Sequence, residues 1–190
     1  MKDIVAKSRS CRRFYGEKKV TVNQLRELAN LARLSPSGAN LQTLKYILVC
    51  SPEVNEKVFE TLGWAGYLKD WDGPVPSERP AGYIIMLRDK TLSKGMAVDE
   101  GIAAQSIFLG ATEMGLGGCM LGNIKKDNLM KVLGLEENYE IALVLALGYP
   151  KEEIVIEEIG EDGDVKYWRD ENQVHHVPKR SLDQVVVKEL

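Results

Sequence analysis

Apolar residues recur at helical spacing in two long segments of the chain. In 22–34, leucines and alanines three and four positions apart form one face. Thr21 and Gln24 have the spacing of a capping box before this segment, and Ser35 precedes a proline, which disfavours helical geometry. The segment from Met96 to Met114 is apolar on most faces, which predicts a helix at the centre of the fold or at a subunit interface.

Runs of aliphatic and β-branched residues predict four strands, with shorter helices between them. We expect strands at 44–50, 81–87, 118–124 and 139–149, and short helices at 2–7, 52–62 and 126–133. This alternation indicates an α/β or α+β protein, and 190 residues fit a single domain over 1–190. Asp162-Gly163 predicts a β-hairpin over 151–174, and 178–190 is expected to form a C-terminal extension.

Composition and charge exclude several classes of function. A formal net charge of −3 argues against nucleic-acid binding, and no apolar stretch has the length of a membrane span. The three cysteines have no CxxC spacing, which favours free thiols in a reducing cytoplasm. Two adjacent histidines, His175 and His176, offer little material for a metal site or a catalytic triad.

Positive charge is concentrated near the N-terminus of this acidic chain, in VAKSRSCRRFYGEKKVT, residues 5–21. Arginine offers a planar fork of donors that suits phosphate oxygens, and serine hydroxyls complete such a site. A solvated basic surface explains the same composition. The stretch by itself leaves both interpretations open.

Three further segments are candidates for chemistry: 35–42, 115–122, and the basic pair Lys179-Arg180 after Pro178, which either is solvated or contributes to a phosphate site. SPSGANLQ, 35–42, follows a helix with small residues and two amides, and either binds a ligand or connects a helix to a strand. GLGGCMLG, 115–122, closes a helix and enters a strand, the reverse of a dinucleotide fingerprint, so a Rossmann site is excluded. Gly115 suits a helix C-terminus, whereas Gly117 and Gly118 leave room for a flat ring.

The order of these motifs resembles the nitroreductase family over nearly the whole chain. The resemblance lies in RSxRxF at the start, SPSxxNxQ after a helix, GLG after the long apolar helix, and PKRSLDxVV near the end. It implies a homodimeric α+β fold of three layers, with a central, mostly antiparallel sheet flanked by helices. It also implies an FMN cofactor and NADH or NADPH as the electron donor.

The resemblance assigns cofactor-binding positions, although Ser8 departs from the family pattern, where a basic residue is common. The basic N-terminal motif and a C-terminal basic pair would hold the FMN phosphate, a loop from the neighbouring subunit would pack on the ring, and a glycine turn would contact it through the backbone. The matching residues are Arg9, Ser10 and Arg12; Pro36, Ser37, Gly38, Asn40 and Gln42; Leu116, Gly117 and Gly118; and Lys179 and Arg180.

The implied reaction is hydride transfer from NAD(P)H through the flavin to a small electron-poor acceptor, such as a nitroaromatic or a quinone. The flavin performs the chemistry, so no catalytic side chain is expected. Trp64, Tyr67 and Trp71 could form the wall of the substrate pocket or simply pack a loop onto the core. Alternatives are a non-nitro acceptor, such as an enone, a halogenated aromatic or free flavin, and a non-catalytic flavin-binding module.

Overall fold

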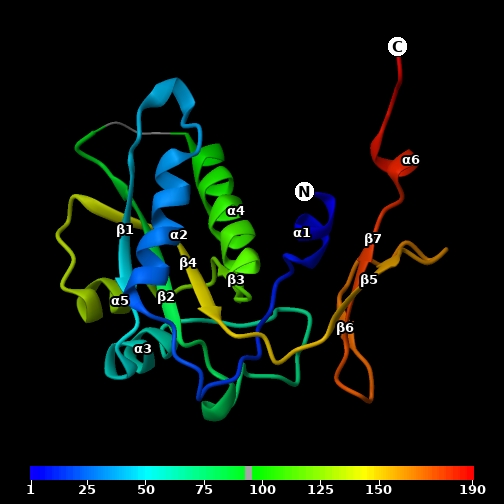
Figure 1. Cartoon of the computed structure of the whole chain (residues 1–190), viewed down its shortest axis with the longest axis horizontal. Coiled ribbons are helices and arrows are strands. Elements are labelled where there is room, and N and C mark those ends of the chain that lie inside the picture. The colour runs from blue at the N-terminus through cyan, green and yellow to red at the C-terminus, as the bar shows by residue number, and fades with distance from the viewer. Residues whose placement is uncertain (93–95) are drawn as a thin grey trace.

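A four-stranded antiparallel sheet forms the centre of the molecule (Figure 1). The computed structural model describes residues 1–92 and 96–190. The strand order is β1-β2-β4-β3, and every neighbouring pair is antiparallel. Each strand confirms a sequence prediction: β1 (Leu44–Val49), β2 (Gly82–Asp89), β3 (Gly117–Leu121) and β4 (Tyr139–Gly148).

Helices cover both faces of this sheet, and successive residues of β2 pack alternately on the two faces. Ile84 and Met86 pack with helices α2 (Val22–Leu34) and α4 (Ala97–Glu113). Tyr83, Ile85 and Leu87 pack with α3 (Pro52–Phe59) and α5 (Lys126–Leu133). The fold is therefore α+β with three layers, as expected.

Local sequence explains where the helices begin and end. The Thr21 hydroxyl accepts from the Gln24 N–H at 3.2 Å, and the Gln24 side chain accepts from the Thr21 N–H at 2.9 Å, which confirms the capping box.

Helix α3 is shorter than the predicted 52–62. Its chain turns away because the Thr61 hydroxyl donates to the Val58 carbonyl at 2.7 Å and Gly63 N–H donates to Asn123.

The predicted β-hairpin over 151–174 is wrong. A second sheet exists here, in the order β5-β7-β6, and its strands are β5 (Ile154–Glu158), β6 (Trp168–Arg169) and β7 (His175–Lys179). Strand β5 pairs with β7 in parallel, so the turn at Gly163 (φ 70°) lies in a long connection and joins no paired strands. The predicted extension from 178 also starts late, because Pro178 and Lys179 belong to β7.

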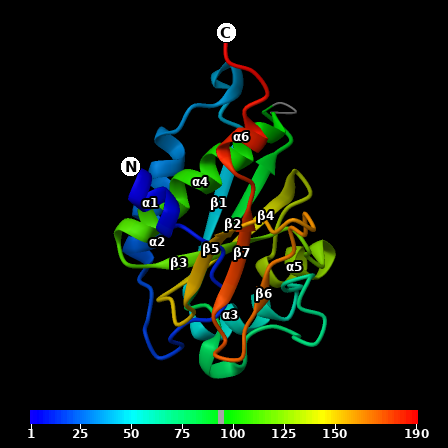
Figure 2. The ribbon, with the colours of Figure 1, turned by 90° about the vertical axis from the view of Figure 1, so that its right-hand side faces the viewer.

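The N-terminal segment lies between the central sheet and this second sheet. After α1 (Lys2–Lys7), Cys11 N–H donates to the Gly118 carbonyl at 2.9 Å, and Phe14 bridges to Pro150. Figure 2 shows β7 in the foreground with α1 beside α4. The short helices η1 (Gly38–Asn40), η2 (Pro76–Glu78) and α6 (Leu182–Val185) complete the fold.

Candidate flavin site

A cavity of about 520 Å³ opens between the N-terminal segment, α4, β3 and the second sheet. The segment after α1 lies beside the edge strand β3, where Ser10 bridges to Gly118, and the second sheet lies on the other side of this segment (Figures 1 and 2). The residues that line the cavity are Ser8, Arg9, Ser10, Arg12, Gln105, Phe108, Gly118, Met120, Ile159, Val165, Tyr167, His175, Val177, Pro178, Lys179 and Arg180.

The cavity brings together three of the four segments that the sequence singled out. Six predicted site residues line it: Arg9, Ser10, Arg12, Gly118, Lys179 and Arg180. They come from positions up to 171 residues apart, counted from Arg9 to Arg180 (180 − 9). Sequence reasoning missed the contribution of α4 and of the second sheet. On α4, the polar residue Gln105 close to Phe108 was the sequence feature that could have indicated this contribution.

Arg12 is the most constrained cation of the cavity. Its side chain is buried, with 8% of the residue exposed. The guanidinium carbon lies 4.8 Å from the centre of the Tyr167 ring, and Nη1 donates to the Ser10 carbonyl at 3.4 Å. Its Nε atom is buried and has no hydrogen-bond partner within residues 1–92 and 96–190. A buried donor without a partner is costly, so this atom suits a bound acceptor.

Glu152 anchors this arrangement from behind the cavity. Its carboxylate accepts from the Arg12 backbone N–H at 2.8 Å, from Arg169 at 2.6 Å and lies 3.2 Å from His175 Nδ1. Burial alone raises the pKa of Glu152, but hydrogen bonds from His175 and Arg12 and the charge of Arg169 lower it to about 2. The carboxylate therefore stays ionised and fixes the second sheet to the N-terminal motif.

The remaining cations leave the cavity with positive charge. Arg9 donates only to carbonyl oxygens, those of Ser8 at 2.7 Å and Val5 at 3.1 Å. Within the described residues, Arg9, Lys179 and Arg180 have no carboxylate partner. Arg13 differs, because it pairs with Glu78 at 2.6 Å and is a structural residue. The open cations suit an anionic group such as a phosphate ester.

The two glycines of β3 have a structural reason that the sequence did not reveal. A Cβ atom on Gly118 would lie 2.3 Å from the Ala146 carbonyl oxygen and 2.4 Å from Phe108. One on Gly117 would lie 2.8 Å from Pro150. Leu116 is buried in the core and does not line the cavity. Backbone contacts from 116 and 117 to a flavin stay a prediction.

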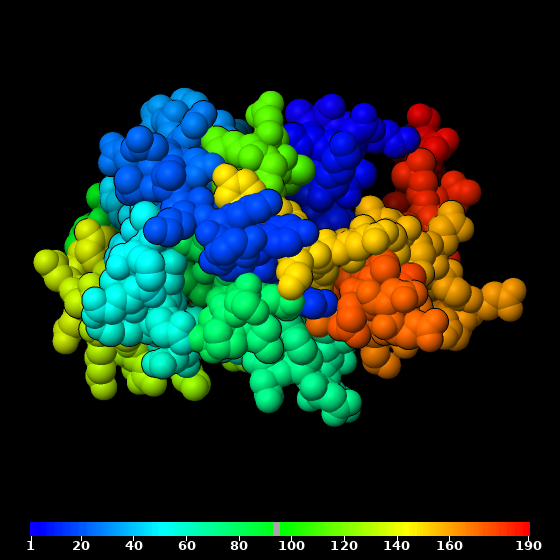
Figure 3. Space-filling model, turned by 60° about the horizontal axis from the view of Figure 1, so that its bottom comes forward, coloured from blue at the N-terminus to red at the C-terminus, as the bar shows by residue number. Residues whose placement is uncertain are grey.

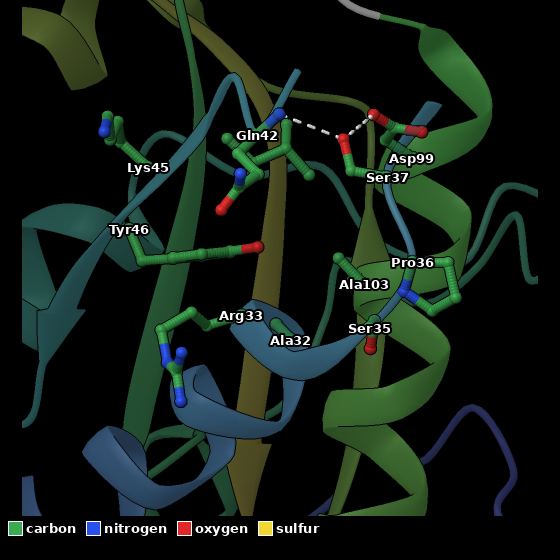
Figure 4. A pocket seen from close by; sticks show the side chains of 11 residues that line it. Ala32, Arg33, Ser35, Pro36, Ser37, Gln42, Lys45, Tyr46, Asp99 and Ala103 are labelled. Carbon is green, nitrogen blue, oxygen red and sulfur yellow. Dashed lines mark hydrogen bonds between the residues drawn. The ribbon is translucent and has the colours of Figure 1, made fainter. Parts of the chain in front are cut away.

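The loop of residues 36–42 lies apart from this cavity within one chain. Pro36, Ser37 and Gln42 line a separate cavity of about 190 Å³ between α2, β1 and α4 (Figure 4). The Ser37 hydroxyl donates to Asp99 at 2.8 Å, and Gly38 N–H donates to the same carboxylate at 2.9 Å. Three residues of the loop have positive φ: Ala39 at 49°, Asn40 at 56° and Gln42 at 51°. Such backbone strain is typical of functional loops.

The aromatic residues of 63–80 pack onto the fold and do not line the cavity. Trp64 contacts Phe59, with ring centres 5.5 Å apart, and Trp71 lies under Arg169. Tyr67 contacts Tyr167, whose other neighbours are Arg12 and His175. Of these residues, Tyr67 contacts the cavity wall from outside, through Tyr167, whereas the contacts of Trp64 and Trp71 are with residues that do not line the cavity.

Neither the two buried thiols nor a metal cluster provides a reactive centre in the residues that the structure describes. Burial raises the pKa of Cys11 to about 12 and also raises that of Cys119, so neither thiol is a ready nucleophile. Over 1–92 and 96–190 no group of His, Cys, Asp and Glu side chains could hold a metal ion. The helices of the same residues are all too short or too polar to span a membrane.

Comparison with known proteins then decides the family. The family model described as the nitroreductase family matches residues 5–149. The chain belongs to the nitroreductase family. An Archaeoglobus fulgidus protein named NADH dehydrogenase/NAD(P)H nitroreductase is 30% identical over 149 residues, which cover 74% of this chain and 80% of that protein.

Solved structures of nitroreductases share the fold. One from Streptococcus pneumoniae superposes with a TM-score of 0.73 at 16% identity and covers 98% of each chain. An FMN-dependent nitroreductase from Clostridium difficile has a TM-score of 0.65 at 25% identity, covering 80% of this chain and 89% of its own. A Desulfitobacterium hafniense nitroreductase with bound FMN has a TM-score of 0.60 at 24% identity, over 78% and 88% of the two chains.

Proposed function

We propose that this nitroreductase-family protein is an FMN-dependent oxidoreductase that uses NADH or NADPH to reduce a small electron-poor acceptor, such as a nitroaromatic or a quinone. The supporting observation is the 520 Å³ cavity, in which cations from both ends of the chain converge on the edge of β3. The names of the relatives, which include an NAD(P)H nitroreductase and an FMN-dependent nitroreductase, agree with this proposal.

The residues of the cavity fit the chemistry of FMN. Its volume lies in the range of ligand pockets, about 300–1,000 Å³. The phosphate needs cations that are not already neutralised, and Arg9, Lys179 and Arg180 meet this need in the described part of the chain. The flavin ring offers carbonyl and nitrogen acceptors, which suit the unpartnered Nε of Arg12.

Each part of the site has a defined task. Arg9, Lys179 and Arg180 would hold the FMN phosphate, and the bound flavin would supply hydride transfer between the reduced nicotinamide and the acceptor. Arg12 places a fixed positive charge in a buried wall, which favours negative charge developing beside it. The side chains of Phe108, Ile159 and Val177 form an apolar part of the cavity wall, which would limit the access of water to the flavin. No side chain is required as a nucleophile.

A second copy of the chain completes the site in this proposal. The loop 36–42 and the flavin cavity share no lining residue within one chain, so a neighbouring subunit would bring the Asn40 and Gln42 amides to the flavin. The strained, anchored backbone of this loop supports a role in contacting a partner. A cytoplasmic location stays a prediction.

Turnover tests this function. We expect the FMN-loaded protein to lose its yellow colour when NADH or NADPH is added without oxygen, and to regain it when a quinone or nitroaromatic is added. Repeated cycles identify an enzyme. A protein that binds FMN and is not reduced by either nicotinamide would be a flavin-binding module instead.

A further inference from the structure

Two lysines of the basic N-terminal stretch do not reach the flavin cavity. Lys18 and Lys19 line a different cavity, of about 380 Å³, which shares no lining residue with the first. It lies where residues 16–20, α3 and the segment 76–81 meet, on the face shown in Figure 3, where these parts are blue, cyan and green. The proposed flavin function therefore does not account for this charge.

The walls of the second cavity combine cations with apolar surface. Lys18, Lys19 and Arg79 carry positive charge, and Glu56, which also lines the cavity, carries a negative charge that is paired with Arg79. Neither lysine has a carboxylate partner among the described residues, although Lys18 Nζ lies 4.5 Å from the centre of the Tyr15 ring, which is outside the cavity lining. The apolar part of the wall comes from Val20, Pro52, Phe59, Pro76, Pro80, Ala81 and Tyr83. Such a lining suits a molecule with an anionic end and an apolar body.

Two buried polar atoms of lining residues have no partner within 1–92 and 96–190. One is a donor, Arg79 Nε, and the other is an acceptor, Asn55 Oδ1. The orientation of Asn55 is fixed, because its amide nitrogen donates to the Ala81 carbonyl at 2.8 Å. Buried groups of this kind are normally satisfied, and here each lacks one complementary group.

The beginning of α3 also lies at the cavity, with the acidic residue Glu53 in the same first turn. Pro52 and Asn55 of its first turn line the cavity, and no side chain caps this end of the helix. The free N–H groups of a helix N-terminus favour an anion. This feature strengthens the case made by the lysines and by the two unpartnered atoms.

We propose that this cavity is a second ligand site, which binds a small aromatic carboxylate bearing a hydroxyl group. The carboxylate would pair with Lys18 and Lys19 and accept from Arg79 Nε. The ring would lie against the apolar wall, and the hydroxyl would donate to Asn55 Oδ1. The site is separate from that of the flavin, and both can be filled together.

Cys50 offers a direct readout, because its half-buried thiol lines this cavity while Cys11 and Cys119 are buried. The experiment follows the rate at which a neutral maleimide modifies the FMN-loaded protein, while para-hydroxybenzoate is titrated. A Cys50→Ser variant shows that the signal comes from this thiol. The same titration is repeated without added FMN, so that binding of para-hydroxybenzoate can be measured even if the protein does not bind FMN.

We expect para-hydroxybenzoate to slow the modification in a saturable manner, with and without FMN. Benzoate, which lacks the hydroxyl, should protect less, and para-hydroxybenzyl alcohol, which lacks the carboxylate, should not protect. The double variant Lys18→Gln, Lys19→Gln should weaken protection about tenfold, the size of one charge-assisted contact. The matched double variant Lys90→Gln, Lys131→Gln removes two exposed lysines that line neither cavity and should bind like the wild type.

Other results overturn the proposal. Absence of protection means that the cavity does not take this class of ligand. Equal protection by the alcohol means that the cations have no part in binding. Protection that disappears as FMN is added means that the carboxylate occupies the flavin cavity.

Discussion

Arg12 is constrained from several directions, and each constraint comes from a different part of the chain. Its backbone N–H is held by Glu152 and its guanidinium lies over Tyr167. The Tyr167 ring also stacks on His175, with ring centres 5.3 Å apart. The second sheet therefore positions the cation that we assign to the flavin ring.

The first prediction concerns Tyr167. Replacing it with leucine removes the aromatic support of Arg12, so the dissociation constant for FMN should rise several-fold, about 1 kcal/mol. Tyr167→Phe keeps the ring and should bind FMN like the wild type. Fluorescence titration with FMN measures both. Equal loss in the two variants would show that the hydroxyl, and not the ring, matters.

The second prediction concerns acid stability and Glu152. Since the pKa of Glu152 is lowered from 4.5 to about 2, its contribution is complete above pH 4.5 and is lost as the pH falls to 2. A shift of this size corresponds to on the order of 3 kcal/mol. Urea unfolding between these pH values should show this loss of stability in the wild type.

Glu152→Gln provides the control for that measurement. The variant should be less stable than the wild type at pH 7, because the buried Arg169 loses its carboxylate, by about 3–5 kcal/mol. Its stability should depend less on pH in the same window. Part of the remaining dependence comes from Glu78, whose pKa is also lowered to about 2, mainly by the hydrogen bond from Arg13. An unchanged pH profile would contradict the role of Glu152.

At the scale of elements, the edge strand β3 joins the core to the site. Its Gly118 accepts from Cys11 through the backbone and lines the cavity, while its Cα faces Phe108 of α4. The strand can lie this close to α4 and β4 only because the glycine has no side chain. Gly118 therefore contributes both to the packing of the core and to the lining of the cavity.

The third prediction follows from this packing. Gly118→Ala should lower the unfolding free energy by about 1–3 kcal/mol, because the new methyl group meets the Ala146 backbone and Phe108. Gly122→Ala is the matched control, since nothing lies within 4 Å of its added Cβ atom, and it should be close to neutral. Urea unfolding of both variants measures the difference. Equal stability of the two would contradict the packing at β3.

The elements with strong periodicity could be predicted from the sequence, and the second sheet could not. Helix α2 has one apolar face and a capping box, so local residues define it. Asp162-Gly163 predicts a turn, and the structure has one, with Gly163 at a φ of 70°. The partner of β5, however, is chosen by tertiary contacts, because Glu152 and His175 bring β7 beside it. No local signal in 151–174 encodes that parallel pairing.

The candidate site shows the same limit. Arg9, Arg12 and Arg180 stand out by residue type and order, so the sequence could single them out. Gln105 and His175 line the cavity only because the chain brings α4 and the second sheet to opposite sides of the N-terminal motif. The sequence also grouped the N-terminal cations together, whereas in the structure Arg9 and Arg12 line one cavity, Lys18 and Lys19 line another, and Arg13 pairs with Glu78.

At the scale of the whole molecule, the proposed flavin site requires two copies of the chain. One chain supplies the cations and the edge of β3, and the loop 36–42 lies at a separate cavity. We therefore predict that FMN binding and dimer formation are linked. Light scattering after size-exclusion chromatography should give the mass of a dimer for the FMN-loaded protein. A fully loaded and active monomer would contradict the proposed contribution of a neighbouring subunit.

The most direct test of the account is the stoichiometry of FMN binding to the purified, folded dimer. Absorbance of the protein after addition of FMN and removal of the excess measures it. The account predicts one FMN for each chain, retained through chromatography. A folded dimer that leaves the column colourless, and takes up no FMN when it is offered, would contradict it.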